Sequence, residues 1–303
     1  MSDCKSVVAF ALLVCVLPVE PATLAAASSS PGGAAARVMK DIPYPGLPKG
    51  DRRRSLDLYL PTDDGRKPPL LIFVHGGFWL LTDDEYRIGP AVAESLVRDG
   101  VAVALVRYRL APANRHPAQA EDVAAAVALL IREASRYGYD SNRIFLSGHS
   151  AGGHLAALVA LDPRYLGKHQ LNAKSLAGVV SFSGLYDLLP RWGISENQKI
   201  ATEKTFSREP AVLKQASPIT HVRADGPPFL VLTAQSDFPG FLPDAKRFSD
   251  VLQKAGDKRV ERWIVAERDH FTTMRLGDRD NEARLLLLDF LKVASLPPEF
   301  AIL

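Results

Sequence analysis

The stretch IFLSGHSAGGHLAALVALD, residues 144–162, places Ser150 between Gly148 and Gly152. The residues before the serine form a short apolar run typical of a buried strand, and those after it have the composition and length of a helix. A Gly-x-Ser-x-Gly pentapeptide between a strand and a helix predicts a tight, strained turn that presents the hydroxyl above the sheet. We expect glycine on both sides because side chains would clash in so sharp a bend.

Two other glycine-rich loops fit this stretch less well. A phosphate-binding loop needs Gly, four residues, Gly, and then Lys and Ser or Thr. Gly148 and Gly153 have that spacing, but His154 and Leu155 follow, so the cation and the magnesium ligand are missing. The Gly-x-Gly-x-x-Gly pattern of dinucleotide sites is also absent from the stretch. We therefore predict no nucleotide cofactor, and we predict no metal site.

The rest of the chain alternates strand-like and helix-like segments. With 303 residues, 47% of them hydrophobic, the chain suits one large α/β domain. Strands buried on both faces read as nearly continuous apolar runs, which predicts a mostly parallel sheet with helices on both faces. We expect strands at 55–60, 69–77, 101–110, 143–148, 176–184, 228–237 and 259–269, and helices at 84–100, 120–138, 151–161, about 243–255 and 281–294.

Residues 187–216 break this alternation and are interpreted as a small cap-like insertion over the edge of the sheet. The net charge is only +3, and no basic cluster is interleaved with aromatic residues. A nucleic-acid partner is therefore not indicated.

The beginning of the chain reads as a targeting segment. An uncharged apolar run is followed by small residues, which indicates a signal peptide over 1–27 with cleavage after Ala27. Residues 28–36 read as a low-complexity linker and 37–303 as the catalytic domain. The run is too short for a typical membrane span, so we expect a secreted or periplasmic protein with no stable span after cleavage. The alternative is an uncleaved anchor.

Ser150 needs a base, because a serine hydroxyl is a poor nucleophile until its proton is accepted. In this architecture the order along the chain is serine, acid, histidine. Of seven histidines, His270 follows the last predicted strand, from which a loop can return it to the serine. His154 lies one helical turn past Ser150 and is expected to pack or cap there. His149 is expected to point away from Ser150.

The acid that orients the base is expected at the end of a strand between serine and histidine. Asp237, which ends VLTAQSD, fits best. Asp187, after an earlier strand, is the alternative, and its other interpretation is a cap for the insertion. Asp269 adjoins His270 but is poorly placed to reach the far ring nitrogen.

The sequence HGGFW, residues 75–79, directly follows a predicted strand. A tetrahedral intermediate needs backbone N–H donors already aimed at its oxyanion. Gly77, Phe78 and Ala151 are the expected donors, with Gly76 shaping the turn. The rings of Phe78 and Trp79 are expected to wall the substrate pocket and to favour short or flat acyl groups.

At this point the chain resembles the α/β-hydrolase superfamily, and more narrowly its carboxylesterase and hormone-sensitive-lipase-like branch. That branch includes feruloyl and acetylxylan esterase-like proteins and arylformamidases. The resemblance implies a triad of Ser150, Asp237 and His270, and a structural role for Arg109. Many lipase-like relatives have a third glycine where this chain has Phe78, so less space is expected here. The motifs that carry the resemblance are HGGFW (75–79), YRLAP (108–112), GHSAGGHLAA (148–157), SPITHV (217–222), SD (236–237) and DHF (269–271).

Two functions follow from this resemblance. The first is hydrolysis of short-chain or aryl carboxylic esters, which are small-molecule substrates, through an acyl-enzyme. The alternative is an arylformamidase-type amidase that releases formate from an aryl formamide. The predicted signal peptide favours the first, because the breakdown of tryptophan derivatives is expected inside the cell.

Overall fold

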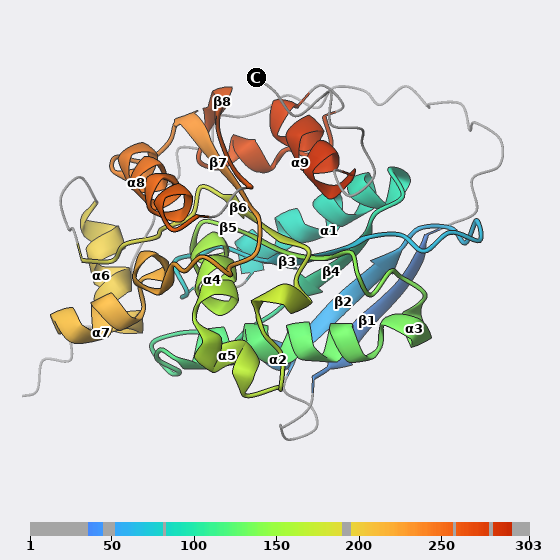
Figure 1. Cartoon of the computed structure of the whole chain (residues 1–303), viewed down its shortest axis with the longest axis horizontal. Helices are drawn as coiled ribbons and strands as arrows, with labels where there is room; N and C mark the ends of the chain where they lie inside the picture. Colours follow the sequence, from blue (N-terminus) through green and yellow to red (C-terminus); the bar gives the residue numbers. More distant parts are fainter. Residues whose placement is uncertain are drawn as a thin grey trace, which may run out of the picture. The chain divides into compact units, whose positions relative to one another are not determined.

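The described part of the chain is built on a sheet of eight strands in the order β1-β2-β4-β3-β5-β6-β7-β8 (Figure 1). The computed structural model describes residues 36–44, 52–80, 83–189, 195–256, 259–278 and 281–292, all within one unit, Ala34–Leu303. The strands are β1 Arg37–Pro43, β2 Ser55–Leu60, β3 Leu70–Val74, β4 Ala102–Val106, β5 Ile144–His149, β6 Gly178–Phe182, β7 Phe229–Ser236 and β8 Val260–Asp269.

Strand β2 runs antiparallel to both β1 and β4, and every pair from β4 across to β8 is parallel. The mostly parallel sheet expected from the sequence is therefore confirmed. The α-helices that connect the strands are α1 Asp83–Arg98, α2 Ala118–Arg132, α3 Ala134–Tyr137, α4 Ala151–Leu161, α5 Pro163–Gly167, α6 Glu196–Thr205, α7 Pro210–Gln215, α8 Phe241–Lys254 and α9 Glu282–Lys292.

Alternate residues of the central strands enter two separate apolar cores, because successive side chains of a strand point to opposite faces. In β3, Leu70 and Ile72 pack with α2, α4 and α8, whereas Leu71 and Phe73 pack with α1 and α9. Figure 1 shows α1 and α9 on one side of the sheet and α2 and α5 on the other. Each fully buried aliphatic side chain contributes about 1.5–3 kcal/mol. The sheet is thus a rigid platform for the loops at its carboxyl edge.

Three elements differ from the sequence prediction. Strand β1 was not expected, because its residues are mostly exposed and lack an apolar run. The single helix expected over 120–138 is two helices, α2 and α3, that meet at Glu133. Gly138 ends α3 with φ 91°, a left-handed conformation that suits glycine, so the predicted helix stop is confirmed. Inside the predicted insertion the structure has α6 and α7.

A buried ion-pair cluster fixes the loop after β4. Asp122 of α2 is fully buried, and Arg109 holds it through two bonds, Nε to Oδ2 at 2.8 Å and Nη2 to Oδ1 at 2.9 Å. Arg54 contacts the same carboxylate from the other side, Nε to Oδ1 at 2.8 Å. Removing one partner would leave a buried charge uncompensated. These contacts give Arg109 the structural role that the resemblance implied.

The predicted signal peptide and linker, residues 1–27 and 28–36, lie outside the described residues except for residue 36. Within the described ranges, each helix is too short or too polar to cross a bilayer.

Candidate active site

Ser150 lies in the tight turn between β5 and α4. Its backbone has φ 54° and ψ −118°, a conformation that costs a non-glycine residue free energy and recurs at functional sites. A Cβ at Gly148 would overlap the backbone of Gly152, and one at Gly152 would overlap the carbonyls of Val74 and His75. The clash argued from the sequence is therefore present: Gly148 is required by the close approach of β5 and α4, and Gly152 by the close approach of β3 and α4.

Asp237 and His270 come together because β7 and β8 end side by side. Ser236 pairs with Asp269 in the sheet, so the next residue of each strand leaves at the same point. Asp237 Oδ1 lies 2.7 Å from His270 Nδ1, and the two side chains are 0% and 4% exposed. An ionised carboxylate only accepts hydrogen bonds, so Nδ1 carries the proton and Nε2 of a neutral ring is left as the basic nitrogen.

Hydrogen bonds keep Asp237 ionised despite its burial. Burial alone would raise the pKa of this carboxyl, but bonds from His270, Ser183 and the Phe238 N–H outweigh it and hold the pKa below its ordinary value. Ser183 Oγ donates to Oδ2 at 2.5 Å, and the Phe238 N–H donates to Oδ1 at 2.8 Å. The hydroxyl of Ser183 thus fixes the carboxylate on the side away from the histidine. No sequence motif marks Ser183 as a site residue.

The two other acids considered from the sequence have different partners. Asp187 accepts from the Leu189 N–H at 3.0 Å and pairs with Arg247 at 3.3 Å. Asp269 accepts from the backbone N–H groups of Phe271 and Thr272, at 3.0 and 2.8 Å, and so closes the turn that follows β8. In the structure it is Asp237 that bonds to the imidazole of His270.

The loop that carries His270 is fastened to the serine turn through His149. His149 Nε2 donates to the His270 carbonyl at 2.7 Å, and the two rings lie 4.7 Å apart. Phe238, Phe241 and Phe271 surround the His270 ring with centroid distances of 4.4, 5.0 and 5.3 Å. The residue next to Ser150 therefore holds the main chain of His270, and aromatic rings limit its contact with water.

The HGGFW loop has the strained backbone of a preformed donor site. Gly77, Phe78 and Trp79 all have positive φ, at 92°, 55° and 61°. Among the described residues, no backbone carbonyl accepts from the N–H of Gly77, Phe78 or Ala151. Ala151 is the first residue of α4, where an N–H has no partner in its own helix and the helix dipole favours negative charge. These three groups are available to an oxyanion.

Tyr108 of the YRLAP segment contacts this loop through both its hydroxyl and its ring. Its hydroxyl lies 3.0 Å from the His75 carbonyl and 3.1 Å from the Gly76 carbonyl, so it can donate to either. Its ring stacks on the imidazole of His75, with centroids 4.3 Å apart. Gly76 therefore holds the turn through its carbonyl, consistent with the shaping role expected for it.

A narrow pocket opens beside Ser150. Its volume is about 10 Å³, the space for about one water molecule. Because the cavity is so small, it has room for a group of few atoms. Both rings expected to wall the pocket, Phe78 and Trp79, line it. The full lining comprises Phe78, Trp79, Ser150, Ala151, Leu185, Gln198, Thr202 and Phe241.

Trp79 and His154 form a fixed pair behind the pocket. The indole Nε1 of Trp79, a residue only 1% exposed, donates to His154 Nδ1 at 3.3 Å. His154 Nε2 donates to the Ala216 carbonyl at 2.8 Å. Burial lowers the pKa of His154 to about 3, so its ring is neutral and both nitrogens are already used. The expectation that His154 packs is confirmed.

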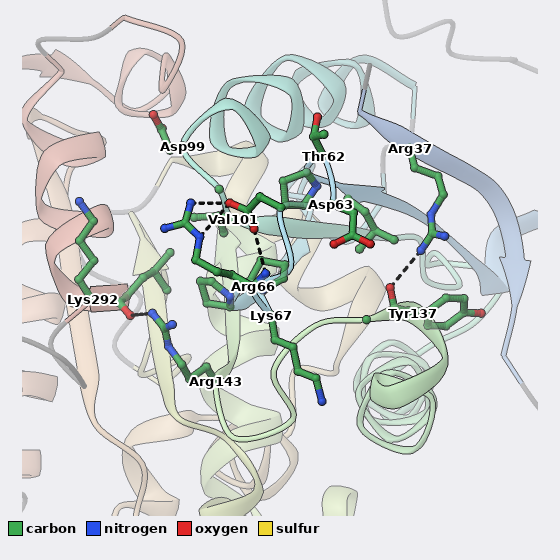
Figure 2. A pocket seen from close by; sticks show the side chains of 18 of the residues that line it. Arg37, Thr62, Asp63, Arg66, Lys67, Asp99, Val101, Tyr137, Arg143 and Lys292 are labelled. Carbon is green, nitrogen blue, oxygen red and sulfur yellow. Dashed lines mark hydrogen bonds and ion pairs between the residues drawn. The ribbon is translucent and has the colours of Figure 1, made fainter. Parts of the chain in front are cut away.

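A much larger hollow, of about 420 Å³, lies elsewhere on the molecule (Figure 2). It is bordered by Pro69, Val101 and Arg143, which directly precede β3, β4 and β5, whereas the serine turn and HGGFW follow strands. It is therefore at the amino edge of the sheet, opposite the site described above. Across the described ranges, no three His, Cys, Asp or Glu side chains converge so as to hold a metal ion.

Comparison with known proteins adds to this geometry. A family model named BD-FAE matches residues 56–240. The chain belongs to the BD-FAE family. It is thus a member of the carboxylesterase branch of the α/β-hydrolases, which confirms the resemblance drawn from the sequence motifs. The matched residues include the HGGFW loop, the serine turn and Asp237, and they end before His270.

Several relatives are similar to this BD-FAE protein. Esterase LipC of Mycobacterium tuberculosis is 33% identical over 221 residues, covering 69% of this chain and 55% of LipC. Kynurenine formamidase of Danio rerio is 31% identical over 256 residues, covering 83% of this chain and 81% of that protein. A solved esterase from the archaeon Pyrobaculum calidifontis has a TM-score of 0.70 at 24% identity, covering 86% of this chain and 87% of its own. This last likeness shows the shared fold.

Proposed function

We propose that this protein hydrolyses carboxylic esters of short or flat acyl groups through an acyl-enzyme on Ser150. The hydroxyl oxygen attacks the ester carbonyl carbon while His270 Nε2 accepts its proton. Asp237 stabilises the imidazolium that forms. The N–H groups of Gly77, Phe78 and Ala151 stabilise the negative oxygen of the tetrahedral intermediate, with Gly76 supporting the turn.

The second half of the reaction uses the same groups. The imidazolium of His270 donates its proton to the alcohol oxygen as the carbon–oxygen bond breaks, which leaves the acyl group on Ser150. A water molecule then attacks the acyl carbon, and its proton passes to His270. Collapse of this intermediate releases the acid, and the proton on His270 returns to Ser150. Each proton is thus accepted and returned by one nitrogen.

The observation that carries this proposal is the buried bond between Asp237 and His270, at 2.7 Å, together with a serine held at φ 54° whose neighbour His149 bonds to the His270 carbonyl. Each feature costs folding free energy, because the carboxylate is desolvated and the serine backbone is strained. Such features are retained most readily where the residues have a function. The names of the mycobacterial relatives LipC and LipQ support an ester as the substrate. This chain spans 55% of LipC and 62% of LipQ.

An arylformamidase activity is the weaker alternative. It is supported by the kynurenine formamidases of Danio rerio and Salmo salar, of which this chain spans 81% and 82% at 31% and 30% identity. The same acid–base groups can cleave an ester or a formamide, because both reactions pass through a tetrahedral intermediate. The pocket beside Ser150 would accept a formyl group as well as an acetyl group.

A substrate panel tests the proposal. Purified protein is assayed with p-nitrophenyl acetate, butyrate and octanoate, with methyl ferulate, and with N-formylkynurenine. We expect kcat/KM to be highest for the acetate and to fall through the butyrate to the octanoate, whereas efficient turnover of methyl ferulate would show that a flat acyl group binds outside the small pocket. Turnover of N-formylkynurenine alone would replace the ester proposal with the formamidase one. An organophosphonate adduct on the peptide that contains Ser150, seen by mass spectrometry, would identify the nucleophile.

We also propose that the protein is exported and that residues 1–27 are removed. The support is the uncharged run followed by Ala25 and Ala27 at the two small-residue positions. N-terminal sequencing of protein from the native host tests this. A mature chain that begins at Ser28 supports cleavage, and a retained Met1 contradicts it.

A further inference from the structure

One polar group in the pocket beside Ser150 has no partner. Gln198 of α6 lines this pocket and is 4% exposed. Among the described residues, no acceptor lies within hydrogen-bonding distance of its Nε2 atom. A buried amide donor without an acceptor is costly, because it has lost its water and gained nothing in exchange. Such a group is retained most readily where a ligand supplies the acceptor.

The orientation of the Gln198 amide is fixed by its position in the helix. Ser195 precedes α6, and its Oγ accepts from the Gln198 N–H at 3.3 Å. In return the Ser195 N–H donates to Gln198 Oε1 at 2.7 Å, which completes a capping box. Turning the amide over would set its NH₂ group against this N–H. The end left for a ligand is therefore the donor, and the ligand atom must be an acceptor.

Helix α6 is itself fastened to the site. The ring of Phe206, directly after the helix, packs edge-on against Trp79 with centroids 4.9 Å apart. Arg115 Nη2 donates to the Phe206 carbonyl at 3.0 Å, and the His116 N–H donates to the Thr205 carbonyl at 2.9 Å. The amide of Gln198 is thus held in place before a ligand arrives, which reduces the entropy lost on binding.

The position of the pocket identifies which part of the substrate enters it. The pocket is bordered by Ser150 and by Ala151, whose N–H is a proposed oxyanion donor. His270, which must reach the leaving alcohol oxygen, is not among the described residues that line it. The alcohol therefore lies on the other side of the reacting carbon, next to His270. The pocket is left for the acyl substituent.

We infer that Gln198 is a specificity residue that donates a hydrogen bond from Nε2 to an oxygen atom on a short acyl group. This inference rests on the proposed esterase function. The substrate class is esters of small acids that carry a hydroxyl or alkoxyl oxygen near the carbonyl carbon. Thr202, one turn along, also lines the pocket, and its Oγ1 donates to the Gln198 carbonyl at 2.8 Å. Its lone pairs remain to accept from an acyl hydroxyl group.

A pair of substrates of nearly equal shape tests the inference. The methoxyacetyl group has an oxygen where the butyryl group has a methylene, so p-nitrophenyl methoxyacetate and butyrate differ in the acceptor. We measure the ratio of their kcat/KM values for each variant. The greater chemical reactivity of the methoxyacetate is common to all variants and cancels when ratios are compared.

Gln198→Met is the decisive variant, because it removes the amide donor at nearly constant volume. Gln198→Glu keeps the capping box and, once the carboxyl is ionised, replaces the NH₂ donor with an oxygen, so it is measured at pH values above the pKa that burial raises. We expect the methoxyacetate-to-butyrate ratio to fall about five- to tenfold in both, the effect of losing one hydrogen bond. Gln253→Glu, at an exposed position of α8, is the matched control, and its ratio should equal that of the wild type.

The outcomes separate this inference from the proposed function. A ratio unchanged in Gln198→Met would overturn the inference, as would equal losses on both substrates together with a lower melting temperature. Either result would make Gln198 a residue that serves the start of α6 alone. A wild-type protein that hydrolyses neither ester would overturn the proposed function and this inference with it.

Discussion

Each edge of the sheet has a cavity, and the candidate active site lies at the edge with the smaller cavity. The amino edge has a hollow of about 420 Å³, and the carboxyl edge has a pocket of about 10 Å³. Figure 2 shows charged side chains around the larger hollow, and the three arginines among them bond to structural partners. Arg37 donates to the Tyr137 carbonyl, Arg143 donates to the Leu291 carbonyl, and Arg66 pairs with the adjacent Asp64.

The carboxyl edge has residues with a strained backbone and a buried, hydrogen-bonded pair of ionisable side chains. Ser150, Phe78 and Trp79 have positive φ there, and the buried pair of Asp237 and His270 directly follows the ends of β7 and β8 at the same edge. Loops that follow parallel strands converge at this edge, so one backbone can present a nucleophile while others present the base and the N–H donors. Strain and buried partnered charge therefore mark the functional edge better than volume does.

The largest effect should come from the serine. Ser150→Ala removes the nucleophile, and kcat/KM for p-nitrophenyl acetate should fall by roughly three orders of magnitude or more. Arg66→Ala, on the opposite edge, should leave it within about twofold, because an exposed ion pair contributes little. Circular dichroism and thermal melting establish that both variants fold. A folded Ser150→Ala protein with wild-type turnover would remove the distinction between the two edges.

The second-largest loss of activity is expected from substitution of Asp237, the proposed acid. Asp237→Asn should lower kcat by roughly two to four orders of magnitude, because the imidazole loses the partner that fixes its tautomer. Asp187→Asn removes the ion pair with Arg247 and keeps an oxygen to accept from the Leu189 N–H, so its kcat should stay within about threefold. Both are measured at saturating substrate. The reverse ranking would move the acid to the loop after β6.

The same carboxyl makes a pH-dependent contribution to stability. The pKa of Asp237 is lower in the folded protein than its ordinary value, so its contribution is present above the unfolded-state pKa of about 3.9 and is lost as pH falls through the folded-state value. The difference in free energy of unfolding between wild type and Asp237→Asn should therefore shrink below about pH 4. Urea titrations at several pH values measure it, and a constant difference would contradict this assignment.

The site residues could be predicted from the sequence best where a motif or a polar residue lies at the end of a predicted strand. The serine turn is readable because two glycines flank Ser150 between an apolar run and a helix. Asp237 and His270 are readable because each directly follows a predicted strand, although β8 proves to be mostly exposed. The register that makes Ser236 pair with Asp269 could not be read, since it is set by packing between distant segments. The motifs thus supplied the groups, and the tertiary structure supplied their distance.

Other site residues had no such signal. Ser183 is a serine after a strand, and nothing local indicates that its hydroxyl reaches Asp237. Gln198 lies in a polar segment that was interpreted only as an insertion. The pattern Ser195-x-x-Gln198 does predict the start of a helix through a capping box, and this signal could have located α6. The same pattern does not show that the NH₂ end of the Gln198 amide enters a pocket, because this depends on where α6 packs.

Replacing one glycine at each edge by alanine tests how tightly the backbone is packed there, and the measured quantity is the free energy of unfolding. A Cβ at Gly152 would meet the backbone of Val74 and His75, which cannot move without disturbing the sheet. Gly152→Ala should therefore cost about 3 kcal/mol or more of unfolding free energy. Gly138 borders the larger hollow at φ 91° with open space around it, so Gly138→Ala should cost about 1 kcal/mol of backbone strain. Urea unfolding at one pH compares them, and equal losses would refute the close-packing argument.

The smallest effect concerns the space beside the serine. Phe78 lines the small pocket and has φ 55°, a conformation that glycine adopts at lower cost. Phe78→Gly should therefore leave the fold stable and keep kcat/KM for p-nitrophenyl acetate within about tenfold, since the backbone N–H remains. With the ring gone, activity on p-nitrophenyl octanoate and pivalate, whose acyl groups are long or branched, should rise relative to acetate. The contrasting possibility is that Phe78 packs the loop against the core, in which case melting temperature and all three rates would fall together. Because acetate needs no added space, only a change in the ratio between substrates supports the role of the ring in the pocket.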